Sequence, residues 1–173
     1  PDTPVEDYFD VIGGKTAVLF SAAAAAGIEI TGAPATQVEA MRVYGMQLGM
    51  AFQIMDDALD YTASAEQMGK NAGDDFADQK ITLPTILAWQ DGDAEERAFW
   101  QRTLGEADFA EGDLERAQAL LTAHDAVNRS VAVANDHAVK ASAALAPFIG
   151  DDRTAPLAHA LADAALFAAH RAS

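Results

Sequence analysis

Three aspartates close an otherwise apolar stretch of the sequence, Phe-Gln-Ile-Met-Asp-Asp-Ala-Leu-Asp over residues 52–60. On a helix, Asp56 and Asp60 lie one turn apart on the same face, and Asp57 lies about 100° round the axis. The negative end of the helix dipole disfavours carboxylates by up to ~1 kcal/mol each, so we expect a cation there. Carboxylate oxygens suit Mg²⁺, which takes one or two of them and completes its shell with waters and substrate phosphates. The pattern therefore predicts a site for Mg²⁺ and a diphosphate.

A polar stretch with both signs of charge follows over residues 62–82. Lys70 and Lys80 flank Gly69, Gly73 and three aspartates. Glycines let the backbone approach a ligand closely, and lysines supply charge that suits phosphate. The alternative is a solvated loop whose exposed ion pairs contribute ~0 to 1 kcal/mol each. Because the stretch directly follows the aspartates, we favour phosphate binding.

Two further polar positions lie within apolar helical stretches. Lys15 and Thr16 follow two glycines, but position 9 is Phe where a phosphate-binding loop of the Walker type needs Gly. Lys15 then has two explanations that stay open, extension to solvent or a polar cavity where it binds diphosphate. Gln53 is on its spacing more typical of a satisfied buried amide than of a catalytic group.

Apolar residues at helical spacing predict an all-α chain of roughly six or seven helices. The helices are expected over residues 5–26, 36–61 and 84–89, and in segments between 94 and 171. Gly27 would stop the first helix, Thr36 would cap the second, and Pro84 would open the third. Residues 62–82 are expected to form an ordered loop, and no linker divides the chain.

Composition excludes several classes of partner. The net charge is -16, with 27 acidic and 11 basic residues, which argues against nucleic acid and anionic membranes. There is no Cys, so disulfide frameworks and thiolate metal sites are excluded and a reducing cytoplasm fits. Polar residues interrupt the apolar runs, so we expect no transmembrane segment.

Four motifs follow one another between residues 5 and 90: Tyr8-x-x-x-Ile12-x-x-Lys15-Thr16-Ala17, Phe52-Gln53-Ile54-Met55-Asp56-Asp57-Ala58-Leu59-Asp60, Gly69-Lys70-Asn71-Ala72-Gly73-Asp74-Asp75 and Lys80-Ile81-Thr82-Leu83-Pro84. Together they resemble the trans-isoprenyl (polyprenyl) diphosphate synthases, and most of all the octaprenyl and decaprenyl members. The resemblance implies an all-α helical bundle of the isoprenoid synthase type with a central cavity, usually a homodimer. It also implies a prenyltransferase that condenses isopentenyl diphosphate with an allylic diphosphate, such as farnesyl diphosphate, into a long-chain polyprenyl diphosphate.

The resemblance also assigns roles to individual residues. The Mg²⁺ ligands would be Asp56 and Asp60, with Asp57 alongside. The allylic diphosphate would be bound by Lys15, Lys70 and Lys80. Near the developing carbocation the matching polar groups are Thr16 and Gln53, and Phe52 matches a cavity wall near the isopentenyl substrate.

The sequence departs from the family pattern in two places. Gln79 stands where the family often has Gly before the lysine, and no first aspartate-rich motif occurs in the chain. Family members carry that motif in an N-terminal half, so residues 1–173 are predicted to be the C-terminal half of one synthase domain. We expect this fragment alone to be inactive, and the helix at 36–61 to expose an apolar face that packs against the absent half.

Two other readings compete with a synthase. A non-catalytic helical subunit of a heteromeric prenyl diphosphate synthase is disfavoured, because such a subunit need not keep Asp56, Asp60 and the three lysines. A class I terpene cyclase shares the helical fold but usually has Asn, Ser or Thr, and Glu as ligands in its second metal motif, so it ranks lower.

Overall fold

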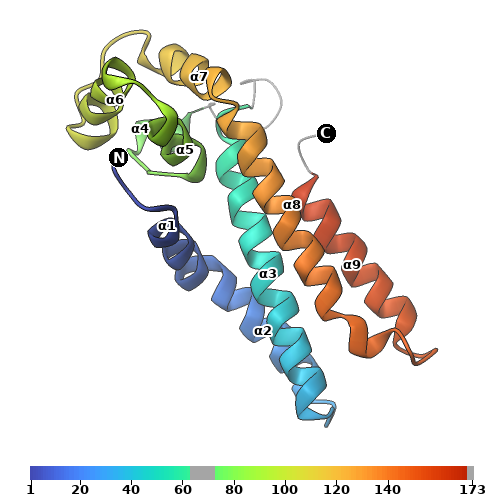
Figure 1. Cartoon of the computed structure of the whole chain (residues 1–173). Helices are drawn as coiled ribbons and strands as arrows, with labels where there is room; N and C mark the ends of the chain where they lie inside the picture. The colour runs from blue at the N-terminus through green and yellow to red at the C-terminus, as the bar shows by residue number, and fades with distance from the viewer. Residues whose placement is uncertain (63–72, 171–173) are drawn as a thin grey trace. The chain divides into compact units, whose positions relative to one another are not determined.

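The computed structural model describes residues 1–62 and 73–170 (Figure 1). Within these ranges the chain forms helices and turns and no β-strand, which confirms the all-α prediction. The elements are α1 (Val5–Ile12), the π-helix η1 (Gly13–Ala17), α2 (Val18–Glu29), α3 (Ala35–Leu59), α4 (Asp74–Ala77), α5 (Leu83–Asp91), α6 (Ala94–Trp100), the π-helix η2 (Gln101–Gly105), α7 (Asp113–Ala123), α8 (Ala126–Ala144), the 3-10 helix η3 (Ala146–Phe148) and α9 (Ala155–Ala169).

The contacts of the chain divide it into two compact units. We call Pro1–Tyr8 with Asp56–Val131 the carboxylate unit, and Phe9–Met55 with Ala132–Ser173 the bundle unit. The division falls inside α1, α3 and α8. No linker-like composition therefore marks it in the sequence.

In the bundle unit, parts of α2, α3, α8 and α9 surround one apolar core (Figure 1). Tyr44 is buried there, and its hydroxyl donates to the Leu161 carbonyl at 2.9 Å. Most of the other buried positions are small, which lets the helices approach closely. The core side chains are Tyr44, Ala141, Leu145, Phe148, Ala158 and Ala165.

In the bundle unit, α3 packs closely against the segment η1–α2. A Cβ on Gly49 would lie 2.5 Å from the Ala17 Cα, and a Cβ on Gly45 would overlap the Phe20 carbonyl. The Ser21 hydroxyl donates to the Arg42 carbonyl at 2.9 Å beside this contact. Only glycine fits at positions 45 and 49 of α3.

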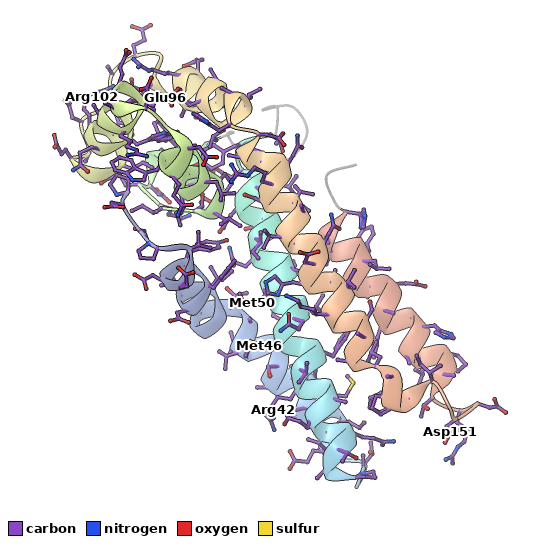
Figure 2. The ribbon with its side chains drawn as sticks, viewed as in Figure 1. Arg42, Met46, Met50, Glu96, Arg102 and Asp151 are labelled. Atoms are coloured by element: carbon purple, nitrogen blue, oxygen red, sulfur yellow. The ribbon has the colours of Figure 1, made fainter. Side chains whose placement is uncertain are left out.

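Side chains at successive turns of α3 flank the glycines. Figure 2 shows Arg42, Met46 and Met50 at these turns. Arg42 is exposed and Met50 is buried. The helix therefore passes from a solvated end into the core.

In the carboxylate unit, side chains of α4, α5, α6 and α7 pack into one core that is rich in aromatic rings. The Phe76 and Phe99 rings stack with their centroids 6.4 Å apart, and Trp100 packs edge-on to Phe99 at 5.1 Å. Arg102 donates to both carboxylate oxygens of Asp113, at 2.9 and 2.7 Å. Bidentate pairs of this kind are geometrically specific, so η2 and the start of α7 are held together.

Several helix ends differ from the sequence-based prediction. Gly27 lies inside α2, which continues to Glu29, because a glycine among alanines costs a helix only about 1 kcal/mol. Thr36 is not a cap, since α3 begins at Ala35 and the Pro34 carbonyl accepts the Val38 N–H at 3.1 Å. Pro84 lies in the first turn of α5, as predicted.

Exposed apolar residues were expected on α3, but most of them lie on other helices. The exposed large hydrophobic residue of α3 is Val43, at 41%. Along α1 and α2, by contrast, Val11 is 62% exposed and Leu19 67%, and on α9 Phe167 is 70% exposed. The prediction that α3 carries the uncovered apolar face was wrong, because apolar spacing does not reveal which neighbour covers a helix.

The first helical run of the chain is long and apolar. Val5–Glu29 is a continuous helical run that contains an 18-residue window with a mean hydropathy of 1.6, long and apolar enough to cross a membrane by length and composition alone. Helices in the core of soluble proteins pass the same test. The apolar stretch is therefore longer than the sequence led us to expect, and the absence of a transmembrane segment stays a prediction.

The glycine contact makes a prediction about stability. We expect Gly45→Ala to lower the free energy of unfolding by about 1–3 kcal/mol, because overpacking outweighs the helix propensity that alanine gains. Urea denaturation measures the effect.

A matched control lies in α2. A Cβ added to Gly27 would have no neighbour within 4 Å, so Gly27→Ala should raise the free energy of unfolding by about 0.5 to 1 kcal/mol. Equal effects of the two substitutions would contradict the close contact at Gly45.

Candidate active site

The predicted site residues of the bundle unit meet where η1 packs on α3. The Thr16 hydroxyl donates to the Gln53 side-chain carbonyl at 2.9 Å. The neighbouring rings of Phe20 and Phe52 lie 5.5 Å apart. The structure thus brings together Thr16, Gln53 and Phe52, although more than 30 positions separate Thr16 from the other two in the sequence.

A π-helical turn presents Lys15 and Thr16. Residues Gly13–Ala17 form η1 between two α-helices. Gly13 and Gly14 are weak helix formers, so replacing an α-helical turn by a wider one costs little there. Single π-helical turns inside α-helices occur frequently at functional sites. Lys15 is exposed on this turn, so its ammonium is open to an incoming anion.

In the carboxylate unit, the three predicted metal ligands have three different environments. Asp56 is exposed at the end of α3. Asp60 is half-buried, and its Oδ2 accepts the Asp75 N–H at 3.0 Å. Burial raises the pKa of Asp60, and that N–H opposes the rise. Asp56 and Asp60 thus keep carboxylate oxygens at the helix end.

Asp57 faces inward instead. It is 5% exposed, and the Tyr8 hydroxyl donates to its Oδ2 at 2.6 Å. Burial and the charge of Asp57 raise the pKa of Tyr8, so the phenol stays protonated and remains a donor. The offset of about 100° on the helix turns Asp57 toward the core, so its geometry differs from that of Asp56 and Asp60, and its role as a third metal ligand stays a prediction.

The segment after the aspartates forms a short acidic helix with a paired lysine. Lys80 Nζ lies 2.5 Å from Asp75 Oδ1 and 3.4 Å from Asp78 Oδ2, and its hydrogen bond to Asp75 raises the pKa of Lys80. Gly73 precedes α4 with φ at 85°. Lys70 and Gly69 lie outside the described residues.

The carboxylates at the end of α3 meet the needs of a divalent cation only in part. Among residues 1–62 and 73–170, no group of three or more His, Cys, Asp or Glu side chains is arranged to hold a metal ion. The pair Asp56 and Asp60 still fits Mg²⁺, because that ion typically uses one or two protein carboxylates and takes further ligands from substrate phosphates and water.

Comparison with known proteins decides the family. The model of the polyprenyl synthetase family matches residues 1–121. The chain belongs to the polyprenyl synthetase family. It is 36% identical over 141 residues to an octaprenyl diphosphate synthase of Haemophilus influenzae, covering 82% of this chain and 43% of that relative.

Solved structures of the family agree in fold. A polyprenyl synthase from Caulobacter crescentus CB15, complexed with calcium and isoprenyl diphosphate, superposes with a TM-score of 0.91 at 41% identity, over 99% of this chain and 51% of that one. A decaprenyl diphosphate synthase from Rhodobacter capsulatus gives 0.89 at 44%, with the same coverage. The chain therefore has the polyprenyl synthase fold and spans about half the length of these relatives or less.

Sequence reasoning gave no role to two groups of the site. Tyr8 stands in the first motif, and the signal that could have found its partner is a phenol on an apolar helix face, since a buried tyrosine usually has a hydrogen-bond partner. The second group is the backbone N–H of Asp75, which donates to Asp60. Because every residue except proline carries a backbone N–H, the residue type does not reveal it.

The backbone at Gln79 has a conformation that suits the Gly which the family often has at this position. Its φ is +57°, in the left-handed region that favours glycine. We expect Gln79→Gly to raise the free energy of unfolding by about 0.5 to 1 kcal/mol, because the strain of the side chain is removed.

The control is the same substitution in an ordinary helix. Gln90 is exposed in α5, so Gln90→Gly should lower the free energy of unfolding by up to about 1 kcal/mol. A loss of stability at both positions would contradict the strain at Gln79.

Proposed function

We propose that this chain is part of a Mg²⁺-dependent trans-polyprenyl diphosphate synthase, a prenyltransferase of isoprenoid biosynthesis. It would condense isopentenyl diphosphate with an allylic diphosphate, such as farnesyl diphosphate, into a long-chain product. The observation that carries the proposal is the pair Asp56 and Asp60 at the end of α3, followed by the helix whose Asp75 holds Lys80. The similarity to octaprenyl and decaprenyl diphosphate synthases supports a long-chain product.

The proposed roles follow the chemistry of each group. Asp56 and Asp60 would hold Mg²⁺, which when bound stabilises charge on a departing diphosphate. The diphosphate would be bound by Lys15, Lys70 and Lys80, which provide point charges that suit phosphate. The C–O bond of the allylic substrate would break first and release diphosphate, the alkene of isopentenyl diphosphate would form the new C–C bond, and the released diphosphate would accept the proton that is lost.

The bundle-unit residues would act on the cationic carbon. The dipoles of Thr16 and Gln53 are fixed by their mutual hydrogen bond, and preorganised dipoles stabilise charge without reorganising. Phe52 would form an apolar wall beside the isopentenyl substrate and exclude water.

We also propose that residues 1–173 are the C-terminal half of the synthase domain. The chain spans 51% of the Caulobacter crescentus structure, and Val11, Val18 and Leu19 on α1 and α2 are exposed apolar residues suited to packing against another helix. The family resemblance extends the proposal to a cytoplasmic homodimer.

A direct assay tests the function. We expect the full-length polypeptide to incorporate labelled isopentenyl diphosphate into polyprenyl diphosphates with farnesyl diphosphate and Mg²⁺. The 173-residue chain alone should be inactive, because one carboxylate pair supplies only one side of a diphosphate clamp. Elongation by the chain alone would overturn the half-domain proposal, and inactivity of both would overturn the function.

The metal ligand makes a second prediction here. Asp56→Ala in the full-length polypeptide should remove most turnover and leave the fold intact, since Asp56 is exposed and not part of the core. We expect the free energy of unfolding to rise slightly, because the substitution removes a negative charge from the negative end of the α3 dipole.

Asp163→Ala is the matched control, since Asp163 is also exposed on a helix, α9, and lies outside every motif. Steady-state turnover with saturating allylic substrate distinguishes the two variants. Normal turnover of the Asp56 variant would remove Asp56 from the metal site.

A further inference from the structure

A buried carboxylate at the end of α3 accepts a hydrogen bond from a buried phenol. Asp57 is 5% exposed in the last turn of α3, where the helix dipole disfavours negative charge. A buried charge is costly unless hydrogen bonds compensate it. The Tyr8 hydroxyl donates to Asp57 at 2.6 Å, within the range of charge-assisted O–H···O⁻ bonds.

The bond connects distant parts of the chain within the carboxylate unit. Tyr8 is 4% exposed and lies 49 positions before Asp57. The first half of α1 is thereby tied to the last turn of α3. Because both partners are closed to solvent, water is a poor substitute for either of them.

The two other carboxyl groups share that turn with Asp57. Asp56 immediately precedes Asp57, and the Asp60 N–H donates to the Asp56 carbonyl at 3.2 Å. At its far end, the turn is held by the bond from the Asp75 N–H to Asp60. Tyr8 and Asp75 thus hold the turn at two points, one on each side of it in sequence.

We propose that Tyr8 is a positioning residue, which through Asp57 holds the turn of Asp56 and Asp60 in the arrangement that receives a divalent cation. The inference rests on the proposed function. Tyr8 does not touch the cation in this account. It acts one step further away than a direct partner of a metal ligand, by fixing Asp57 in the helical turn that carries Asp56 and leads to Asp60.

The experiment measures Mn²⁺ affinity by isothermal titration calorimetry in the full-length polypeptide, at a temperature where every variant is folded. Tyr8→Phe removes only the hydroxyl. We expect it to weaken Mn²⁺ binding about tenfold, the lower end of the effect of removing a direct partner of a metal ligand, because Tyr8 acts through Asp57.

Tyr44→Phe is the matched control. Tyr44 is equally buried, at 3%, and its hydroxyl also donates one hydrogen bond, but to the Leu161 carbonyl and not to a carboxylate. It should leave the Mn²⁺ affinity unchanged even if it lowers stability. An equal loss of affinity in both variants, or an unchanged affinity in Tyr8→Phe, would overturn the proposal.

If Tyr8→Phe does not fold, a second pair of variants tests the same hydrogen bond from the side of Asp57. Asp57→Asn retains an oxygen that can accept from Tyr8, whereas Asp57→Ala does not. We expect Asp57→Asn to bind Mn²⁺ more tightly than Asp57→Ala. Equal losses would show that the charge of Asp57 matters instead, and would overturn the positioning role.

Mn²⁺ binding by Asp56→Ala and by Tyr8→Phe distinguishes failure of the positioning role from failure of the metal site. If Asp56→Ala abolishes Mn²⁺ binding while Tyr8→Phe has no effect, the metal site stands and the positioning role falls. If Asp56→Ala leaves Mn²⁺ binding unchanged, the proposed metal site itself falls, and the role of Tyr8 with it.

Discussion

The close packing of α3 on η1 and α2 is the constraint on which the bundle unit depends. Gly45 and Gly49 remove the side chains that would keep the backbones apart. With the backbones in contact, the register between the two segments is fixed, and Gln53 lies one turn beyond Gly49 against Thr16. The position of Gln53 beside Thr16, the pair proposed to face the carbocation, therefore depends on glycine at the two contact positions of α3.

The end of α3 shows a different constraint, which is excess negative charge. Its three aspartates are stabilised in three ways: a phenol for Asp57, a backbone N–H for Asp60 and solvent for Asp56. Solvent stabilises the charge of Asp56 less than a phenol or a backbone N–H would at the negative end of a helix. In the proposed synthase, this residual charge favours binding of a cation.

The sequence predicted what depends on residue type and period, and missed what depends on contacts. Helical periodicity and the four motifs were enough for the all-α fold and the family. The π-helical turn at Gly13–Ala17 and the continuation of α2 past Gly27 depend on local energies that a stop signal does not measure. The inward turn of Asp57 depends on Tyr8, 49 positions away, and no spacing rule reaches that far.

In the proposed synthase, Lys80 would bind a phosphate while already paired with carboxylates of its own segment. Its ammonium pairs with Asp75 and Asp78, and its side chain is 49% exposed. The Asp78 side chain is 67% exposed, and such exposed ion pairs contribute only about 0 to 1 kcal/mol, so exchanging this partner for a phosphate costs little. Asp75 meanwhile remains connected to Asp60 through its backbone N–H, which does not depend on the lysine. In the proposed synthase, a phosphate would therefore replace Asp78 at Lys80 while the carboxylate turn stays in place.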